Sequence, residues 1–474
     1  MKIKNALIVA LCVITVILPL IAVSIAAQLI PPKFDGSFTG VLDDKVDRLA
    51  EINEPKIVVV GGSSVAFGLE SELIERYTGM PVVNFGLYAS LGTKLMLDLS
   101  REHINEGDII VLAPELDAQT LSMYFNSAQT LRAADGRPDI LLDIPFEHAF
   151  SLMSASWDFA ADKLAYEIGG TAPSYEGVYS ADSFNEYGDI SYPRPENIMP
   201  LYYDPNTEIN LTPDILAADF CDYLNEYTEH ARDKGAEVYF SYCPMNSLAI
   251  GEPDPEAFAR YLEQKLECTF ISDVSDYILE PGYFYDTNFH TNGAGARLRT
   301  VRLTEDLLLE LGIPTAVTDD VPPPPELPKL DLRFFGEDEN AKYFEYARLA
   351  DGSYMIIGVK DEYKGEKTLT VPLGYDTYKV TQIGAGAFSG TSLEALILTE
   401  DTNVRHFMNG AFLGASSLNA LYIYYPTEQD ITPPADFVGV ASSFKVYIPE
   451  GSAYTTGYYW SERGLDFEYV SGAE

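Results

Sequence analysis

The sequence is poor in basic residues and in cysteine. Of its 474 residues, 31 are Lys or Arg and 72 are Asp or Glu, which leaves a formal net charge of −41. A surface this acidic repels phosphate backbones, so we expect no nucleic-acid partner. Four cysteines are too few for a disulfide scaffold or a multi-cysteine zinc module. No cluster of His, Cys and Asp has the spacing of metal ligands, and we expect neither a metal nor a cofactor.

Apolar residues are plentiful, at 47 % of the chain, and aromatic residues make up 12 %. This composition supplies enough apolar surface for packed cores and excludes a largely disordered chain. The length predicts about three units at roughly 150 residues each.

One long uncharged run, residues 6–27, lies near the N-terminus and follows Lys2 and Lys4. A helix of this length spans a hydrocarbon core about 30 Å thick, whereas a cleavable signal peptide has an apolar stretch of only about 7–15 residues. We therefore expect residues 1–30 to be an uncleaved single-pass anchor in the cell membrane, with the domains outside. Cleavage after Ala26 is the alternative. With Cys12 in the membrane, three cysteines lie outside, namely Cys221, Cys243 and Cys268. Because an odd number cannot all pair with one another, we expect free or buried thiols.

From residue 57 to about residue 313, short apolar strands alternate with helices. This pattern is typical of βαβ units and predicts a three-layer α/β domain over residues 31–315, with a parallel sheet covered on both faces. Between about residues 119 and 213 the alternation lapses, and we interpret this stretch as an insertion that covers one end of the sheet. The expected strands are 57–60, 81–85, 109–113, 237–242 and 269–272, and the expected helices are 70–77, 93–104, 212–235, one that opens at 254, and 292–311.

A proline-rich linker over residues 316–332 contains four consecutive prolines and predicts a polyproline II spacer. After the linker, the alternation of strands and helices is replaced by a sequence repeat of 24 to 25 residues. Its matching positions are Ala387-Phe388 with Ala411-Phe412, Gly390 with Gly414, Leu396 with Leu421, and a degenerate third copy at Phe437, Gly439 and Phe444. Periods of this length are typical of leucine-rich solenoids. We expect residues 343–371 and 447–467 to cap the stack.

This C-terminal section, residues 333–474, resembles the BspA-like leucine-rich repeats of bacterial surface proteins. The resemblance covers about residues 343–460 and includes the element Ile383-Gly-Ala-Gly-Ala-Phe388 and the exit Val446-Tyr-Ile-Pro449. It implies a surface-exposed interaction module whose ligand is a protein or a glycan.

A Gly-Gly-Ser sequence follows the first expected strand, where Gly61 and Gly62 precede Ser63. Ligands of open α/β sheets bind outside the carboxyl ends of strands. A serine at such a point can present its hydroxyl to a substrate, with backbone donors beside it. A plain Gly-Ser turn is the alternative interpretation.

Asp286 and His290 occur together just before the last expected helix. A nucleophilic serine needs an imidazole to take its proton and a carboxylate to orient that imidazole. The other histidines lie on expected amphipathic helices, in the insertion or in the repeats, and are His103, His230, His148 and His406. By elimination, His290 is the candidate base.

Together these elements resemble the SGNH/GDSL hydrolase superfamily across about residues 57–311. Ser63 falls where the family has the serine of Gly-Asp-Ser, with Gly62 in place of the acid. Asp286 and His290 match the family's C-terminal pair, although they are four residues apart where the family has three. The resemblance implies a flavodoxin-like three-layer fold and a catalytic Ser63, His290 and Asp286.

The resemblance also implies an oxyanion or substrate site. The second strand, with Asn84, matches the family block whose following loop gives a backbone donor, at Ala89 or at Gly86. The third block usually supplies an asparagine donor, but here the strand leads to Glu115, and a carboxylate cannot donate unless it is protonated. Glu115 then binds a substrate hydroxyl or cation, or lines the cleft. Asn246 is a candidate replacement donor.

Two functions remain open. The first is a membrane-anchored extracytoplasmic serine esterase or acyltransferase, which acts on acetyl or alanyl esters of cell-envelope polysaccharide. Membrane-anchored SGNH-like proteins of alginate acetylation and of D-alanine transfer to lipoteichoic acid are similar. The second is a non-catalytic surface adhesin, in which the repeats bind a partner and the α/β domain is a carbohydrate-binding stalk.

Overall fold

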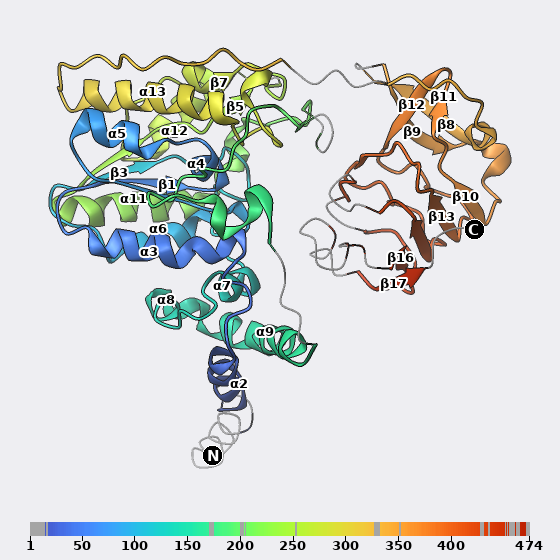
Figure 1. Cartoon of the computed structure of the whole chain (residues 1–474), viewed down its shortest axis with the longest axis horizontal. Coiled ribbons are helices and arrows are strands. Elements are labelled where there is room, and N and C mark those ends of the chain that lie inside the picture. The colour runs from blue at the N-terminus through green and yellow to red at the C-terminus, as the bar shows by residue number, and fades with distance from the viewer. Residues whose placement is uncertain are drawn as a thin grey trace. The chain divides into compact units, whose positions relative to one another are not determined.

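The chain forms two compact units (Figure 1). The first lies within residues 1–197 and 205–327, and the second lies within residues 198–204 and 328–474. The computed structural model describes residues 15, 18–169, 175–199, 203, 205–251, 254–326, 332–349, 352–426, 431–434, 437–450, 452, 454, 460 and 465–470.

A parallel sheet of five strands, in the order β2-β1-β3-β4-β6, forms the centre of the first unit. Every neighbouring pair in this sheet is parallel. The strand order reverses next to β1, so the carboxyl ends of β1 and β3 flank the point where ligands bind in open α/β sheets. The strands are β1 (Ile57–Gly61), β2 (Val82–Gly86), β3 (Ile109–Leu112), β4 (Glu237–Phe240) and β6 (Thr269–Phe270), with a separate parallel pair, β5 (Met245–Asn246) and β7 (Ile278–Leu279).

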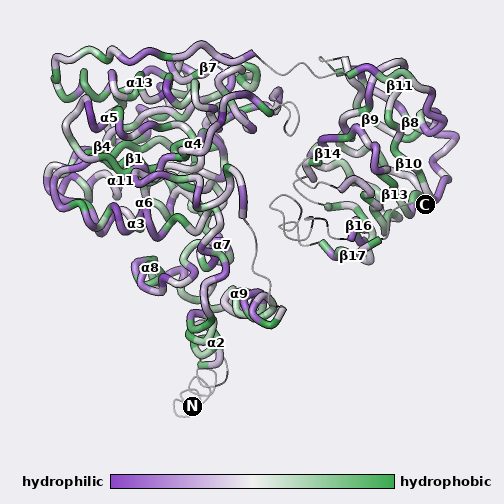
Figure 2. Tube along the Cα trace, viewed as in Figure 1, coloured by the Kyte–Doolittle hydropathy of each residue, from purple (hydrophilic) through white to green (hydrophobic). Residues whose placement is uncertain are grey.

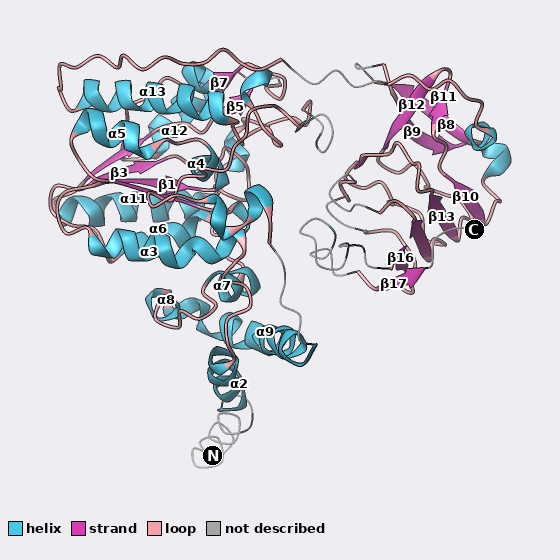
Figure 3. Cartoon of the chain, in the orientation of Figure 1, coloured by secondary structure: helices cyan, strands magenta, loops and turns pink. Residues whose placement is uncertain are grey.

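Helices cover both faces of this sheet (Figure 3). Helices α3, α6 and α11 lie on one face, and α5 and α13 on the other. Alternate residues of β1 supply the two cores, because Val58 and Val60 pack with the first set whereas Ile57 and Val59 pack with the second. The helices are α3 (Leu42–Glu51), α4 (Ser63–Phe67), α5 (Ser71–Thr78), α6 (Thr93–Arg101), α11 (Ala218–Asp233), α12 (Pro255–Lys265) and α13 (Gly293–Glu310).

The parallel α/β prediction is confirmed, and all five expected strands are present. The helix expected from Thr212 begins later, at Ala218. Thr212 precedes only a short 3-10 turn, Pro213–Ile215, after which Leu216 is extended. The Thr212-Pro213 pair therefore marks a turn, and the helix begins after it.

The first part of the insertion, up to residue 169, contains three helices, which its composition did not predict. It contains α7 (Ser127–Ala133), α8 (Ile140–Asp143) and α9 (Ala149–Gly169), and α9 packs against the N-terminal helix α2 (Leu18–Leu29). These four helices gather on one side of the first unit (Figure 1). The trace of α2 is largely hydrophobic, as are the central strands, whereas α3 is largely hydrophilic (Figure 2).

Among the described residues, no helix is long and apolar enough to cross a membrane. Much of the predicted anchor, including Cys12, lies outside the described residues. The remaining cysteines are Cys221, Cys243 and Cys268, and all three are free and buried, as expected.

The second unit contains a solenoid of parallel strands, as the repeat predicts. Ala395, Ala420 and Lys445 lie side by side in successive strands, one repeat apart. Gly390, Gly414 and Gly439 all have positive φ, which explains a glycine at this position of each turn. The stacked strands are β10 (Thr368–Thr370), β13 (Ala395–Leu398), β15 (Ala420–Ile423), β16 (Lys445–Pro449) and β17 (Phe467–Val470).

A second sheet precedes and flanks this stack. Its strands are β8 (Phe344–Arg348), β9 (Tyr354–Val359), β11 (Gly374–Tyr375), β12 (Tyr378–Ile383) and β14 (His406–Phe407). Strands β8 and β9 form an antiparallel pair within the expected N-terminal cap.

The first part of the expected linker runs along the first unit. Asp319 accepts hydrogen bonds from Arg76 and Tyr77, each at 2.7 Å. The carbonyl of Pro322 accepts one from the Tyr283 hydroxyl at 3.3 Å. Up to Pro322, this segment is therefore held on the α/β unit rather than standing free as a spacer.

Candidate active site

Ser63 lies directly behind β1, at the first residue of α4. The turn that precedes it is unusually close to the neighbouring strands. A Cβ atom at Gly62 would lie 2.1 Å from Glu115 Oε2, and one at Gly61 would lie 2.5 Å from the carbonyl oxygen of Ala113. Gly61 therefore has no room for a side chain, because the obstructing atom belongs to the backbone, whereas a side chain at Gly62 would displace the end of Glu115. The result is a serine held rigidly at the carboxyl end of the sheet and only 4 % exposed.

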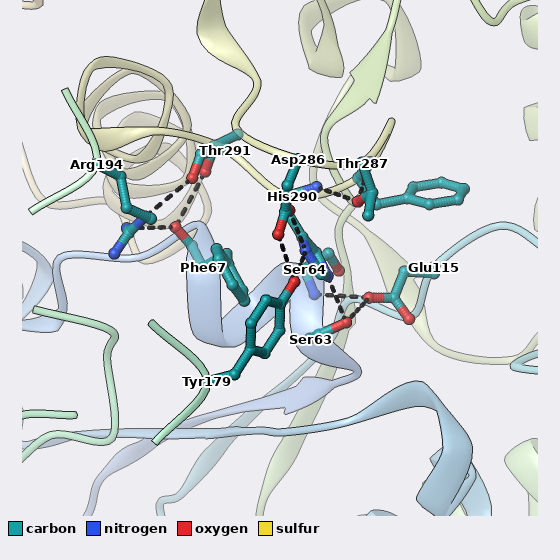
Figure 4. A network of polar contacts seen from close by, with 11 residues as sticks. Ser63, Ser64, Phe67, Glu115, Tyr179, Arg194, Asp286, Thr287, His290 and Thr291 are labelled. Carbon is teal, nitrogen blue, oxygen red and sulfur yellow. Dashed lines mark hydrogen bonds and ion pairs between the residues drawn. The ribbon is translucent and has the colours of Figure 1, made fainter. Parts of the chain in front are cut away.

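Ser63, His290 and Asp286 form one hydrogen-bonded chain (Figure 4). His290 Nε2 lies 2.8 Å from Ser63 Oγ, and His290 Nδ1 lies 2.8 Å from Asp286 Oδ1. With Nδ1–H donating to the carboxylate, Nε2 is left to accept the serine proton. This is the geometry of a nucleophile, a general base and an orienting acid. The structure thus brings together the three residues that the sequence singles out.

The loop before α13 accommodates the four-residue spacing of Asp286 and His290. The N–H of Tyr285 donates to the carbonyl of His290 at 2.8 Å, which closes the loop. The N–H of His290 donates to Thr287 Oγ1 at 3.1 Å. These two hydrogen bonds fix the loop between Asp286 and His290, which is one residue longer than the spacing expected from the resemblance. The imidazole of His290 still reaches the Asp286 carboxylate.

Two side chains that the sequence does not single out as site residues hold the pair in place (Figure 4). The Tyr179 hydroxyl donates to Asp286 Oδ2 at 2.5 Å. The ring of Phe67 stacks on the His290 imidazole, with ring centroids 4.0 Å apart and an interplanar angle of 4°. Arg194 donates to the carbonyl of Phe67 at 3.1 Å. Tyr179 lies in the insertion, so this segment completes the site.

Glu115 follows β3 and contacts the same serine (Figure 4). Its Oε1 lies 3.2 Å from Ser63 Oγ and accepts the N–H of Ser64 at 2.6 Å. Its Oε2 is buried and has no hydrogen-bond partner among the described residues. Burial raises the pKa of Glu115, and the negative charge of Asp117 raises it further. The serine has one proton, which an ionised Glu115 and His290 would both accept.

Replacing Glu115 by glutamine should stabilise the first unit at pH 8 but not at pH 4. Folding raises the pKa of this carboxyl above its ordinary value of 4.5. The folded protein therefore loses stability as the pH rises from 4.5 through the folded-state pKa. The free-energy cost of the ionised, buried carboxylate is fully present at pH values above the folded-state pKa and absent at pH values below the ordinary pKa. The variant should therefore be more stable than the wild type at pH 8 and equally stable at pH 4.

Thermal melting at the two pH values measures this gain, with Trp157 fluorescence reporting the first unit in a Trp460→Phe background. The exposed Glu229 provides the control, because Glu229→Gln should change the stability equally little at both pH values. An equal effect of Glu115→Gln at pH 4 and pH 8 would contradict a costly buried charge.

The other expected oxyanion residues are largely engaged within the fold. Asn84 is buried, donates to the carbonyl of Val65 at 3.0 Å and accepts the N–H of Gly86 at 3.1 Å. Asn246 is also buried and donates to Asn288 Oδ1 at 2.9 Å. Ala89 opens a 3-10 turn and is half-buried. These bonds give Asn84 and Asn246 structural roles and occupy the Gly86 N–H.

Neither a thiol nor a metal site adds to this arrangement. Cys243 is fully buried, and burial raises the pKa of its thiol, which disfavours a nucleophilic thiolate. In the part of the chain that the structure describes, no group of three or more His, Cys, Asp or Glu is placed to hold a metal ion.

Comparison with known proteins gives partial likenesses to leucine-rich-repeat proteins. No protein-family model matches the chain, and no curated protein matches it. A leucine-rich-repeat protein of T. pallidum matches 23 % of this chain and 69 % of its own, at 15 % identity and a TM-score of 0.17. A leucine-rich cell surface protein of Faecalibacterium prausnitzii matches 25 % of this chain and 38 % of its own, at 18 % identity and a TM-score of 0.16. The strands of the chain itself show an α/β region, built on a parallel sheet, and a C-terminal repeat region of stacked parallel strands.

Proposed function

We propose that the first unit is an SGNH-type serine esterase or acyltransferase that acts on acetyl or alanyl esters of cell-envelope polysaccharide. The observation that carries this proposal is the chain of two 2.8 Å contacts from Ser63 through His290 to Asp286. Ser63 Oγ attacks the ester carbonyl while His290 Nε2 takes its proton, and Asp286 stabilises the imidazolium. His290 then protonates the leaving alcohol. Water or a second sugar hydroxyl completes the cycle by attacking the acyl-serine.

Glu115 fits this scheme in its protonated form. An ionised carboxylate beside Ser63 would repel the oxyanion and compete for the serine proton. Burial favours the neutral carboxyl, which can donate a hydrogen bond where the SGNH family uses an asparagine. One such donor is worth about 3–4 kcal/mol of transition-state stabilisation. Glu115 is therefore proposed as the oxyanion donor of this site.

The rest of the chain supports an envelope location. We propose that residues 1–30 anchor the protein in the cell membrane, so that both units lie outside. The leucine-rich-repeat-like unit is then a surface module that binds a protein or a glycan. An acyl ester of envelope polysaccharide is the substrate class within reach of a tethered enzyme.

A serine-directed fluorophosphonate probe tests the catalytic proposal on the full chain. The probe should label the wild-type protein covalently, because His290 is placed to activate Ser63. Ser63→Ala should abolish the labelling, whereas Ser64→Ala should retain it. Labelling that persists in Ser63→Ala would show that another residue reacts.

A non-catalytic adhesin is the second candidate, and one feature of the site favours it. The N–H groups of Ser64 and Gly86 are engaged by Glu115 and Asn84, which leaves fewer donors for an oxyanion. The same experiment separates the two candidates. A folded wild-type protein that the probe does not label would favour the adhesin.

A further inference from the structure

The helix α9 presents two different apolar faces. One face, which includes Leu152 and Phe159, is buried in the core of the first unit. The opposite face is exposed and uncharged, and its residues recur every three or four positions, so they share one side of the helix. This exposed stripe consists of Phe150, Ser154, Trp157, Ala161, Leu164 and Ile168.

The segment before α9 extends the exposed apolar surface. Leu142 in α8 is exposed, and Phe146, just before α9, is 92 % exposed. Large apolar side chains that are scattered singly on a surface need no explanation, but a helical stripe of them does. Since α9 has 21 residues, the stripe runs for about 30 Å.

The acids around the stripe do not interrupt it. Asp162 is paired with Arg132 at 3.0 Å. Glu167 is paired with Lys33 at 2.6 Å. The exposed Asp158 flanks the stripe at its edge. A surface with this pattern presents a continuous apolar centre and a polar margin.

The helix that neighbours α9 carries the argument for what covers the stripe. α9 packs against α2, and α2 continues the uncharged sequence of residues 6–17 without a single charge. Leu18, Ile21, Ile25 and Leu29 of α2 are exposed as well. If the N-terminal run enters a bilayer, a helix packed beside its end lies at the membrane surface. Trp and Phe are favoured at that depth, where an aromatic body meets both chains and headgroups.

We propose that the exposed stripe of α9 lies on the outer face of the lipid bilayer, at the boundary of headgroups and acyl chains. The occupant is zwitterionic lipid, because the chain carries a net charge of −41 and anionic headgroups would repel it. This contact fixes the first unit beside the membrane instead of leaving it on a flexible tether. The proposal rests on the proposed anchor and is independent of the chemistry at Ser63.

The chain contains only two tryptophans, which makes the contact measurable. Trp157 lies in the stripe and is 59 % exposed, whereas Trp460 is fully buried in the second unit. The full chain is reconstituted into phosphatidylcholine vesicles whose acyl chains either carry bromine or do not. In the Trp460→Phe variant, bromine should reduce the emission of Trp157 by about half or more, as expected for a side chain at the acyl boundary.

The Trp157→Phe variant is the matched control, since Trp460 should show the same emission in both kinds of vesicle. A second pair tests the stripe itself: Leu164→Gln should weaken the quenching of Trp157, whereas Ala165→Gln, beside the stripe, should not. Equal Trp157 emission in both kinds of vesicle, from protein that floats with the vesicles, would overturn the proposal and leave the anchor intact. Crosslinking between copies at position 157 would then assign the stripe to a second copy of this chain. Protein that does not float would refute both the anchor and the lipid contact.

Discussion

His290→Asn is expected to lower the turnover of an aryl ester such as p-nitrophenyl acetate by about 10²–10⁴-fold, the usual contribution of a positioned general base. Asparagine cannot accept the serine proton in the way that His290 Nε2 does at 2.8 Å from Ser63 Oγ. In the proposed mechanism the imidazole acts in the transition state and contributes little to substrate binding, so the loss should appear in kcat rather than in KM. Steady-state kinetics on the full chain measure both quantities.

The half-buried His230, on α11, provides the matched control for this variant. His230→Asn carries the same chemical change and should leave kcat within about twofold, in line with substitutions away from special features. Both variants should unfold at the same temperature as the wild type within a few degrees. An unchanged kcat in His290→Asn would remove the imidazole from the reaction.

Phe412→Ala is expected to destabilise the second unit by about 3–5 kcal/mol, as truncation of a buried phenylalanine does. The ring of Phe412 is fully buried and stacks on Phe388 and Phe437, with centroids 6.0 and 5.2 Å away. Its removal leaves a cavity at the centre of the repeat stack, where rings from three successive turns meet.

Trp460 reports this loss, because its ring lies 6.1 Å from Phe437 and its indole N–H donates to the carbonyl of Ile431. Urea unfolding followed by Trp460 emission in a Trp157→Phe background gives the stability of the second unit. The adjacent Leu413 is 57 % exposed, so Leu413→Ala should cost less than about 0.5 kcal/mol. Equal effects of the two substitutions would mean that the aromatic stack does not support the solenoid.

The sheet of the first unit was predictable because its signal is local. Runs such as 57–60 are apolar at every position, short and followed by glycine, which together are typical of a strand buried on both faces. Helix α9 was not predicted, because its sequence carries no clear local signal. Its apolar residues lie on two faces, one buried and one exposed, so no single amphipathic period stands out.

The residues of the candidate site also fall into those that the sequence predicts and those that it does not. Ser63, His290 and Asp286 were predictable because their chemistry is specific and because the strand ends of a parallel sheet converge. Tyr179 and Phe67 were not, since a tyrosine hydroxyl and a stacked ring carry no motif that links them to a distant loop. The engagement of Asn84 and Asn246 also depends on three-dimensional partners, which their positions in the sequence do not reveal.

The close fit of Gly62 and Glu115 has a consequence for substitutions at this site. The carboxylate of Glu115 fills the space that any side chain at position 62 would need. An aspartate at position 62 would therefore require the Glu115 side chain to move, or a shorter residue at position 115. The two positions share one space, so a side chain at position 62 should be tolerated better when the residue at position 115 is small.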